Sequence, residues 1–309
     1  MKNFKNILVY LDGQSNLINS PAIQKGRELV MKNQGQMTLM DVIQPPQDVS
    51  QAYQGIFSTT DLFNMFVRCR KDDLSTLAAQ LNDEGIQTSS RVTIGRPFIE
   101  IIRQMQGAGH DLFIKDAALC EQGFDSQDFH LLRKSAHPLW LLRENSDANE
   151  VLVTVDLAQE SQPEGRLLNR HLVRMAQEIV QTHNQKLHLL SCWTLYGEDA
   201  LRNSGFMRVS KDKLHDMMLE ECQKNADIQE ALVDEFPDTS IQLHLLKGDP
   251  TEVIPQFIQN HPINLVVMST VSRSDIPGLF IGATSEQLLQ KLTTSVLAMK
   301  PNGFQSPVE

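Results

Sequence analysis

The chain has 309 residues, of which 41% are hydrophobic and 21% charged, the balance of an ordinary globular protein of about two domains. Its formal net charge of −10 argues against non-specific nucleic-acid binding, which needs an excess of Lys and Arg to neutralise phosphates. No apolar run approaches the roughly 20 residues of a transmembrane helix. Met1–Lys5 leads into a strand without the apolar core of a signal peptide. We therefore expect a cytoplasmic protein with no nucleic-acid or membrane partner.

The four cysteines are widely separated and form no CxxC pair, which disfavours a disulfide framework or a structural zinc site and fits a reducing compartment. We expect each to be a small buried hydrophobe rather than a nucleophile. The sequence also lacks the GxSxG, HExxH, P-loop and glycine-rich dinucleotide signatures. No catalytic residues are therefore predicted.

The first half alternates apolar strands with amphipathic helices. A continuous apolar run over 6–12 is typical of a strand buried on both faces. Ser20 and Pro21 then open a helix as its cap and first residue, and Gly85 ends a long helix over 60–84. Further strands are predicted at 37–43, 86–94, 110–115 and 138–143, and further helices after Pro97 and over 125–134.

The same order of elements begins again after a polar linker over 144–149. Gly95-Arg96-Pro97 matches Gly248-Asp249-Pro250 at a shift of 153 residues, and Asp111–Ile114 matches Asn264–Val267 at the same shift. In this half we predict strands at 151–156, 186–195, 241–246, 263–268 and 295–300, helices over 163–183, 211–236 and 285–292 and after Pro250, and an extended segment through Gly205.

A repeat of this size indicates a duplicated domain rather than a solenoid unit. The order of strands and helices in each half predicts an α/β fold of two tandem flavodoxin-like domains. Each is a doubly wound, Rossmann-like, five-stranded parallel sheet with the strand order 3-2-1-4-5. We place the domains at residues 1–144 and 150–303.

The loop over 269–284 is the first place to look for function. It follows a buried strand and precedes a helix, so it lies at the carboxyl end of the predicted sheet, where open parallel sheets bind their ligands. The alternative interpretation is a tight strand-to-helix connection with ordinary capping.

The residues of this loop favour an anion. Ser269 and Ser272 offer backbone N–H groups and hydroxyls, and Gly282 permits close approach of the backbone to a phosphate. The start of the next helix adds a favourable dipole. Ala283 has no hydroxyl to donate, and Thr284 is predicted to serve instead as the helix cap.

This loop is similar to the nucleotide loop of the universal stress proteins, whose pattern is Gly, two residues, Gly, nine residues, Gly, and then Ser or Thr. Laid on this sequence, the pattern falls on Ser269, Ser272, Gly282 and Ala283. The spacing is intact, whereas one glycine of three remains and the hydroxyl is lost.

With two such halves, the whole chain resembles a tandem universal stress protein. Asp128–Lys134 and Ile276–Gly282 are similar to the E-type tandem members of gamma-proteobacteria. The resemblance implies a cytoplasmic stress-response protein that binds a small molecule at the strand ends. It implies no enzyme; slow ATP hydrolysis is the most such a protein would show, and we do not expect it.

The resemblance also implies a binding site for ATP or another adenine nucleotide in the second half. Asp156, beside Val155, would meet ribose or adenine, and Met268 would flank the base. The phosphates would be held by Ser269, Ser272, Gly282, Ala283 and Thr284. For Asp156, as for Asp12 in the first half, capping at a strand end is an equal alternative.

The first half departs further from the family pattern. The segment over 115–124 is short and almost free of glycine, so it is predicted not to cradle phosphates. Lys115 is expected to pair with Asp116 or a neighbour. We predict that this half does not bind nucleotide by the family's route.

Two histidines offer a weaker candidate for a metal site. His188 and His244 lie in Leu-His-Leu-Leu patterns on strands that neighbour each other in the predicted order. No spacing motif supports a metal, and two histidines on a covered or edge face is the interpretation we favour.

Two other functions remain open. The long loops after both second strands exceed the usual connection length, as lids do, so an apolar or lipid-like small molecule is an alternative ligand. A third hypothesis is a protein-interaction scaffold with vestigial pockets. The residues that would line an apolar cavity, if they are not helix core, are Phe57, Phe63, Phe66, Met217 and Met218.

The duplication also bears on assembly. Single-domain members of the family pair through their last strands, which implies that Leu139–Leu142 meets Val296–Met299 within one chain. Such pairing satisfies two otherwise exposed sheet edges. We expect a monomer with an internal pseudo-dimer, or a dimer of tandem chains.

Overall fold

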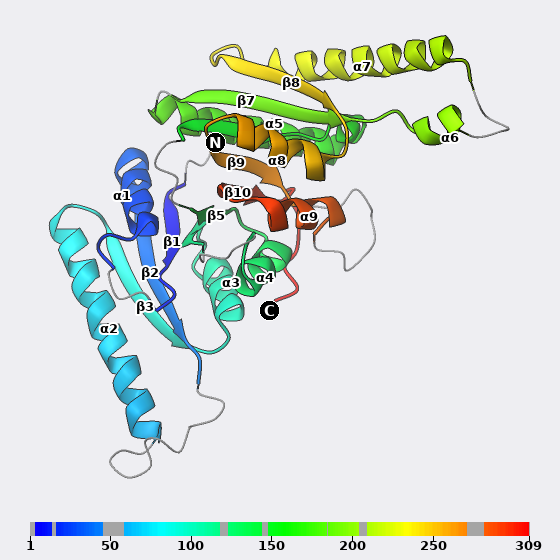
Figure 1. The fold of residues 1–309 in the computed structure, drawn as a ribbon. Helices are drawn as coiled ribbons and strands as arrows, with labels where there is room; N and C mark the ends of the chain where they lie inside the picture. The colour runs from blue at the N-terminus through cyan, green and yellow to red at the C-terminus, as the bar shows by residue number, and fades with distance from the viewer. Residues whose placement is uncertain are drawn as a thin grey trace. The chain divides into compact units, whose positions relative to one another are not determined.

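The computed structural model describes residues 4–13, 17–45, 59–117, 123–143, 148–183, 185–203, 209–270 and 281–308. The chain forms two compact units, Met1–Glu144 with Gln305–Glu309, and Asn145–Phe304. Over the described residues, both units alternate five strands with helices, and the second unit has two additional short helical elements (Figure 1). Most of the predicted linker, 144–147, lies outside the described residues.

The first unit is built on five parallel strands in the order β3-β2-β1-β4-β5. The strands are β1 (Asn6–Tyr10), β2 (Gln36–Ile43), β3 (Thr88–Ile94), β4 (Leu112–Asp116) and β5 (Leu139–Leu142). The helices are α1 (Pro21–Asn33), α2 (Thr59–Asp83), α3 (Pro97–Gly107) and α4 (Ser126–Lys134). The apolar run of β1 is wholly buried at the centre of the sheet, because β2 and β4 pair with its two sides.

The helix ends of this unit follow local chemistry. Ser20 caps α1, its hydroxyl accepting from the N–H of Ile23, and Pro21 is the first helical residue, as predicted. Gly85 follows α2 with φ of +82°, a conformation that favours glycine over residues with a Cβ.

The described side chains of α2 that are buried all lie at or after Val67. Leu74, Leu77 and Leu81 are buried, whereas Phe66 is 64% exposed, so its assignment to the core was wrong. A 25-residue helix spans about 37 Å, and the seven residues of its partner β3 span about 23 Å. The amino-terminal turns of α2 therefore extend past the strand that would cover them. Phe57 lies outside the described residues.

The second unit has five parallel strands in the order β8-β7-β6-β9-β10. Counted within the unit, this is again 3-2-1-4-5. The strands are β6 (Glu150–Thr154), β7 (Lys186–Trp193), β8 (Ile241–Lys247), β9 (Ile263–Ser269) and β10 (Ser295–Met299). The helices are α5 (Pro163–His183), α6 (Glu198–Asn203), α7 (Lys211–Val233), α8 (Pro250–Asn260) and α9 (Ala283–Lys291), with a 3-10 turn, η2 (Leu157–Ser161).

Two of these elements were not predicted. The extended segment proposed through Gly205 contains α6, and η2 fills the connection between β6 and α5. Both are short, and their residues lack the long periodic pattern from which helices are recognised.

Helices cover both faces of the second sheet. Gln229 on α7 donates to the hydroxyl of Ser191 at 3.1 Å, and the ring of Phe257 on α8 packs against His188 with centroids 5.8 Å apart. Ser191 and His188 are an odd number of residues apart on β7, so they point to opposite faces. The predicted doubly wound, parallel architecture is confirmed. Among the described residues, no helix is both long and apolar enough to cross a membrane.

Candidate functional site

The carboxyl end of β6 leads into Val155 and Asp156. Val155 is buried, and its N–H donates to the carbonyl of Leu190 at 3.2 Å, which extends the backbone pairing to the end of the strand. Asp156 then caps η2, one carboxylate oxygen accepting from the N–H of Ala158 at 3.2 Å. The capping interpretation of Asp156 is therefore what the structure shows.

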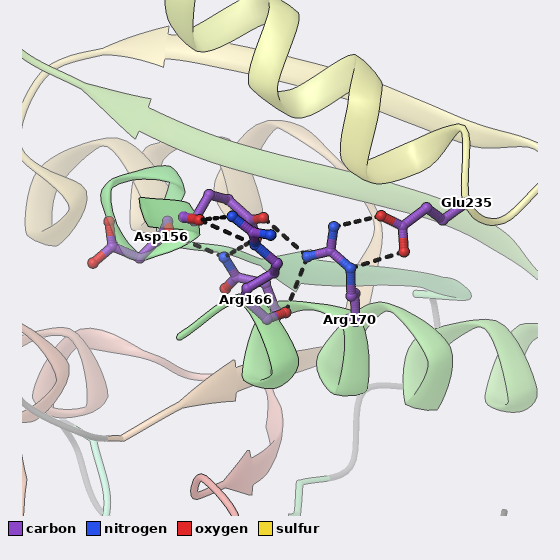
Figure 2. Close-up of polar contacts among 6 residues, drawn as sticks. Asp156, Arg166, Arg170 and Glu235 are labelled. Atoms are coloured by element: carbon purple, nitrogen blue, oxygen red, sulfur yellow. Dashed lines mark hydrogen bonds and ion pairs between the residues drawn. The ribbon is translucent and has the colours of Figure 1, made fainter. Parts of the chain in front are cut away.

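A polar network holds η2 in place (Figure 2). Asn169 on α5 donates to the carbonyl of Asp156 at 3.0 Å and to Glu160 Oε1 at 2.8 Å. Arg170 donates to Glu160 Oε2 at 2.9 Å and binds both carboxylate oxygens of Glu235, just past the end of α7. In Figure 2 the carboxylate of Asp156 points away from these side chains. The network therefore fixes the backbone of Asp156, whereas the carboxylate of Asp156 lies on the side away from the network.

The other candidate residues lie where β9, the neighbour of β6, ends and α9 begins. Met268 is buried in the core, and the carbonyl of Thr270 accepts from the N–H of Gly282 at 3.0 Å. Ser285 donates its hydroxyl to the carbonyl of Ser269 at 3.3 Å. Ser272 lies outside the described residues.

The cap of α9 differs from the prediction. The N-cap is Gly282, two residues before the predicted Thr284, and no side-chain hydrogen bond caps the helix. Ala283 and Thr284 stand exposed in the first turn. In the described part of the chain, the amino end of α9 therefore lacks the side-chain acceptor that most helices have.

The equivalent edge of the first unit is charged. Lys115 ends β4 and is only 1% exposed, and its ammonium lies 2.8 Å from Asp128 Oδ1, 3.4 Å from Asp12 Oδ2 and 3.6 Å from Asp125 Oδ2. Burial alone lowers the pKa of Lys115, but these carboxylates outweigh it and raise that pKa above its ordinary value. Burial also raises the pKa of Asp128 to about 6.

Asp116 does not pair with Lys115, so that part of the prediction was wrong. It accepts from the hydroxyl of Ser20 at 2.6 Å and from the N–H of Ala22 at 2.8 Å, at the start of α1. A carboxylate at a helix amino end is stabilised by the helix dipole and by the free N–H groups there. The other part of the prediction, a neighbouring partner for Lys115, is met by Asp128.

The two candidate metal-binding histidines do meet. His188 Nδ1 lies 3.0 Å from His244 Nε2, and His188 Nε2 lies 2.8 Å from Glu150 Oε2. Burial, with the neighbouring His188 and His261, lowers the pKa of His244, which keeps its ring neutral. Over the described ranges no three His, Cys, Asp or Glu side chains are grouped so as to hold a metal ion. The arrangement is a hydrogen-bonded pair covered by α8.

The described cysteines differ in burial, and none is shown to be a nucleophile. Burial raises the pKa of Cys192 to about 12, so its thiol stays protonated. Cys192 and Cys222 are half-buried, but Cys69 is exposed, contrary to the expectation that every cysteine is buried. Cys120 lies outside the described residues.

Comparison with known proteins agrees with this geometry. Residues 149–300 match the model of the universal stress protein family. Universal stress protein E of Escherichia coli K12 is 29% identical over 69% of this chain and 68% of its own length. Universal stress protein E of Photorhabdus laumondii is 25% identical over 100% of this chain and 99% of its own length. The second unit therefore contains a universal stress protein domain, and the whole chain is similar to universal stress protein E.

Solved structures show the same fold. A protein of unknown function from Pseudomonas aeruginosa PAO1 superposes with a TM-score of 0.71 at 19% identity, covering 97% of this chain and 94% of its own. A putative universal stress protein from Pseudomonas aeruginosa UCBPP-PA14 gives 0.67 at 19% identity, covering 97% and 95%. The tandem arrangement is thus shared along nearly the whole chain.

The sequence analysis missed two groups of residues. The network of Glu160, Asn169, Arg170 and Glu235 joins segments more than 60 residues apart and has no local pattern. The carboxylates around Lys115, in contrast, could have been located from a local sequence pattern. Asp125 is the first residue of the helix predicted over 125–134, where an Asp is typical of an N-cap, and Asp128 lies in the first turn.

Proposed function

We propose that this chain is a cytoplasmic, non-catalytic ligand-binding protein of the stress response, whose second unit binds an adenine nucleotide weakly. The phosphates would lie at the first turn of α9 and the ribose or base near Asp156. The tandem chain would act as a monomer with an internal pseudo-dimer. Binding, rather than a chemical step, is the activity proposed.

The observation that carries this proposal is the amino end of α9. Gly282 supplies no side-chain cap, and the exposed residues after it, Ala283 and Thr284, carry no charge; the one acidic residue of the first turn is Glu286. A helix start of this kind presents N–H groups and the positive end of the dipole, which suit a phosphate. Ser285, one residue on, already directs its hydroxyl to Ser269, so Thr284 is the exposed hydroxyl of this turn.

Asp156 supports the other end of the ligand. It follows β6, next to β9, at the carboxyl edge where parallel sheets bind ligands. Its carboxylate is half-buried and held on a fixed turn, and a carboxylate accepts hydrogen bonds from sugar hydroxyls. Met268 is buried, so it would support the base from below rather than cover it.

The test is a substitution at the N-cap of α9, with thermal stability measured alongside binding because Gly282 is buried. Gly282→Asp places a carboxylate at the N-cap, where it stabilises the helix by a few tenths of a kcal/mol relative to glycine, yet meets the phosphates with a like charge. We expect ATP affinity to fall at least tenfold, about 1.4 kcal/mol, with no loss of thermal stability. Gly282→Ser is the matched control, since it caps the helix without charge.

Isothermal titration calorimetry with ATP measures both variants against the wild type. The proposal requires binding by the wild type and by Gly282→Ser, and weaker binding by Gly282→Asp. Equal affinity of the aspartate and serine variants would place the ligand elsewhere. An apolar adduct without any response to ATP would favour the alternative of an apolar ligand.

A further inference from the structure

The two units can be compared position by position at their ligand edges. The N–H of Leu11 donates to Met40 and that of Val155 to Leu190, each just after the first strand of its unit, which makes Asp12 and Asp156 equivalent. Tyr10 pairs with Lys115, and Val153 with Val267, one residue before Met268, so Lys115 and Met268 are equivalent.

The helices that follow are equivalent as well. α4 and α9 each have nine residues and each follow the fourth strand of their unit. Asp125, the N-cap of α4, therefore corresponds to Gly282, and Asp128 corresponds to Ser285. Three positions that are apolar or neutral in the second unit, Met268, Gly282 and Ser285, are charged in the first.

In the first unit these charges occupy the helix start. Asp125 Oδ1 accepts from the N–H of Asp128 at 2.7 Å, which closes the first turn of α4. Asp128 is fully buried, and its Oδ1 accepts a hydrogen bond from the ammonium of Lys115 at 2.8 Å. With Asp12 at 3.4 Å, three carboxylates surround one ammonium, a net charge of −2 when all are ionised. A phosphate arriving here would meet an occupied cap and a negative field.

Stability does not explain this cluster. Asp128 Oδ2 is buried without a hydrogen-bond partner, and burial raises the pKa of Asp128, so the ionised form is held at a cost. Buried ion pairs are often no more stable than apolar groups of the same volume. The second unit shows that the same fold forms with Met268 in place of Lys115.

We propose that Lys115, Asp125 and Asp128 are specificity-determining residues that fill the first unit's strand-end site with the chain's own charges, so that an anionic ligand binds the second unit alone. Asp125 stands where a phosphate would cap the helix, and Lys115 balances the buried carboxylate of Asp128. The inference rests on the proposed function only for its choice of ATP as probe.

The experiment restores the proposed binding site of the first unit in a chain whose second-unit site is blocked. The parent is the full chain carrying Gly282→Asp. The opened variant adds Lys115→Met, Asp125→Gly and Asp128→Ser, the residues of the second unit. Equilibrium dialysis with ATP should show one site gained, with at least tenfold more ATP bound than by the parent at equal concentration.

A folded opened variant that binds no more ATP than its parent overturns the inference. Folding is judged by circular dichroism and by the fluorescence of Trp140 on β5. A second variant guards against misfolding: Asp125→Gly with Asp128→Asn keeps Lys115 and the shape of the buried Asp128 side chain but removes the helix cap and two negative charges. It should bind ATP and inorganic phosphate where the parent does not, and its failure to do so also overturns the inference.

The two proposals fail separately. If the wild type binds no ATP, the proposed function is wrong, whereas gain of a site by either opened variant still supports the inference. If the wild type binds one ATP and neither opened variant gains a second site, the proposed function stands and the charged cluster is not what closes the first unit.

Discussion

Asn169 is the buried centre of the network that holds η2, and its removal should destabilise the second unit strongly. It is 3% exposed and makes two hydrogen bonds, one to the carbonyl of Asp156 and one to the carboxylate of Glu160. A neutral hydrogen bond contributes about 1 kcal/mol and one to a charged group about 1.5–3 kcal/mol. Asn169→Ala should therefore cost about 2–4 kcal/mol.

The two tryptophans allow the loss to be assigned to one unit. Trp140 lies on β5 in the first unit and Trp193 at the end of β7 in the second. In a Trp140→Phe background, fluorescence during urea unfolding reports the second unit. With a urea dependence of about 2 kcal/mol/M, the midpoint should fall by about 1–2 M.

The matched control is Arg166→Ala. Arg166 binds the backbone carbonyl of the same Glu160 at 3.1 and 3.2 Å, but it is exposed, so water replaces its contacts. Its removal should cost less than about 1 kcal/mol. If Asn169→Ala shifts the midpoint no further than Arg166→Ala, the network does not hold η2 as described.

Three further predictions concern single groups. Burial raises the pKa of Asp128 in the folded protein to about 6, so its contribution to the free energy of unfolding is present below its unfolded pKa and is lost as the pH rises through 6. The stability of Asp128→Asn relative to the wild type should therefore increase by up to about 3 kcal/mol between pH 4 and pH 7. A stability difference that does not depend on pH contradicts this. Burial raises the pKa of Glu150, but hydrogen bonds from Lys186 and His188 outweigh it and lower that pKa. Glu150→Gln should therefore destabilise the second unit at pH 7, and less so below pH 4, where protonation of Glu150 removes the same stabilisation from the wild type. Equal losses of stability at pH 7 and below pH 4, measured by urea unfolding, refute this. Ser20→Ala removes the cap of α1 and the hydroxyl donor to Asp116 and should cost about 1–2 kcal/mol, measured by Trp140 fluorescence in a Trp193→Phe background; a change below about 0.5 kcal/mol would show that the cap is dispensable.

Much of the fold could be predicted because its determinants are local. The apolar run of β1, the Ser20-Pro21 start of α1 and the glycine after α2 act within a few residues of one another. The exposure of Phe66 could not be predicted, because it depends on how far β3 extends beside α2. Helical spacing records which face a residue is on, but not whether anything covers that face.

The positions of the candidate site residues in the fold were predicted in outline, whereas their role in binding stays a prediction. Asp156, Gly282 and Ala283 lie at the carboxyl edge of the second sheet as expected. The cap of α9 was misplaced, because Thr284 has the chemistry of a cap but lies inside the first turn. Ser272 and the intrachain pairing of the last strands stay predictions.

Native mass spectrometry of the intact chain with ATP tests the account most directly, because it counts ligands. The account predicts one ATP per wild-type chain, lost in Gly282→Asp. A wild type that takes up a second ATP, or none at millimolar ATP, would contradict it.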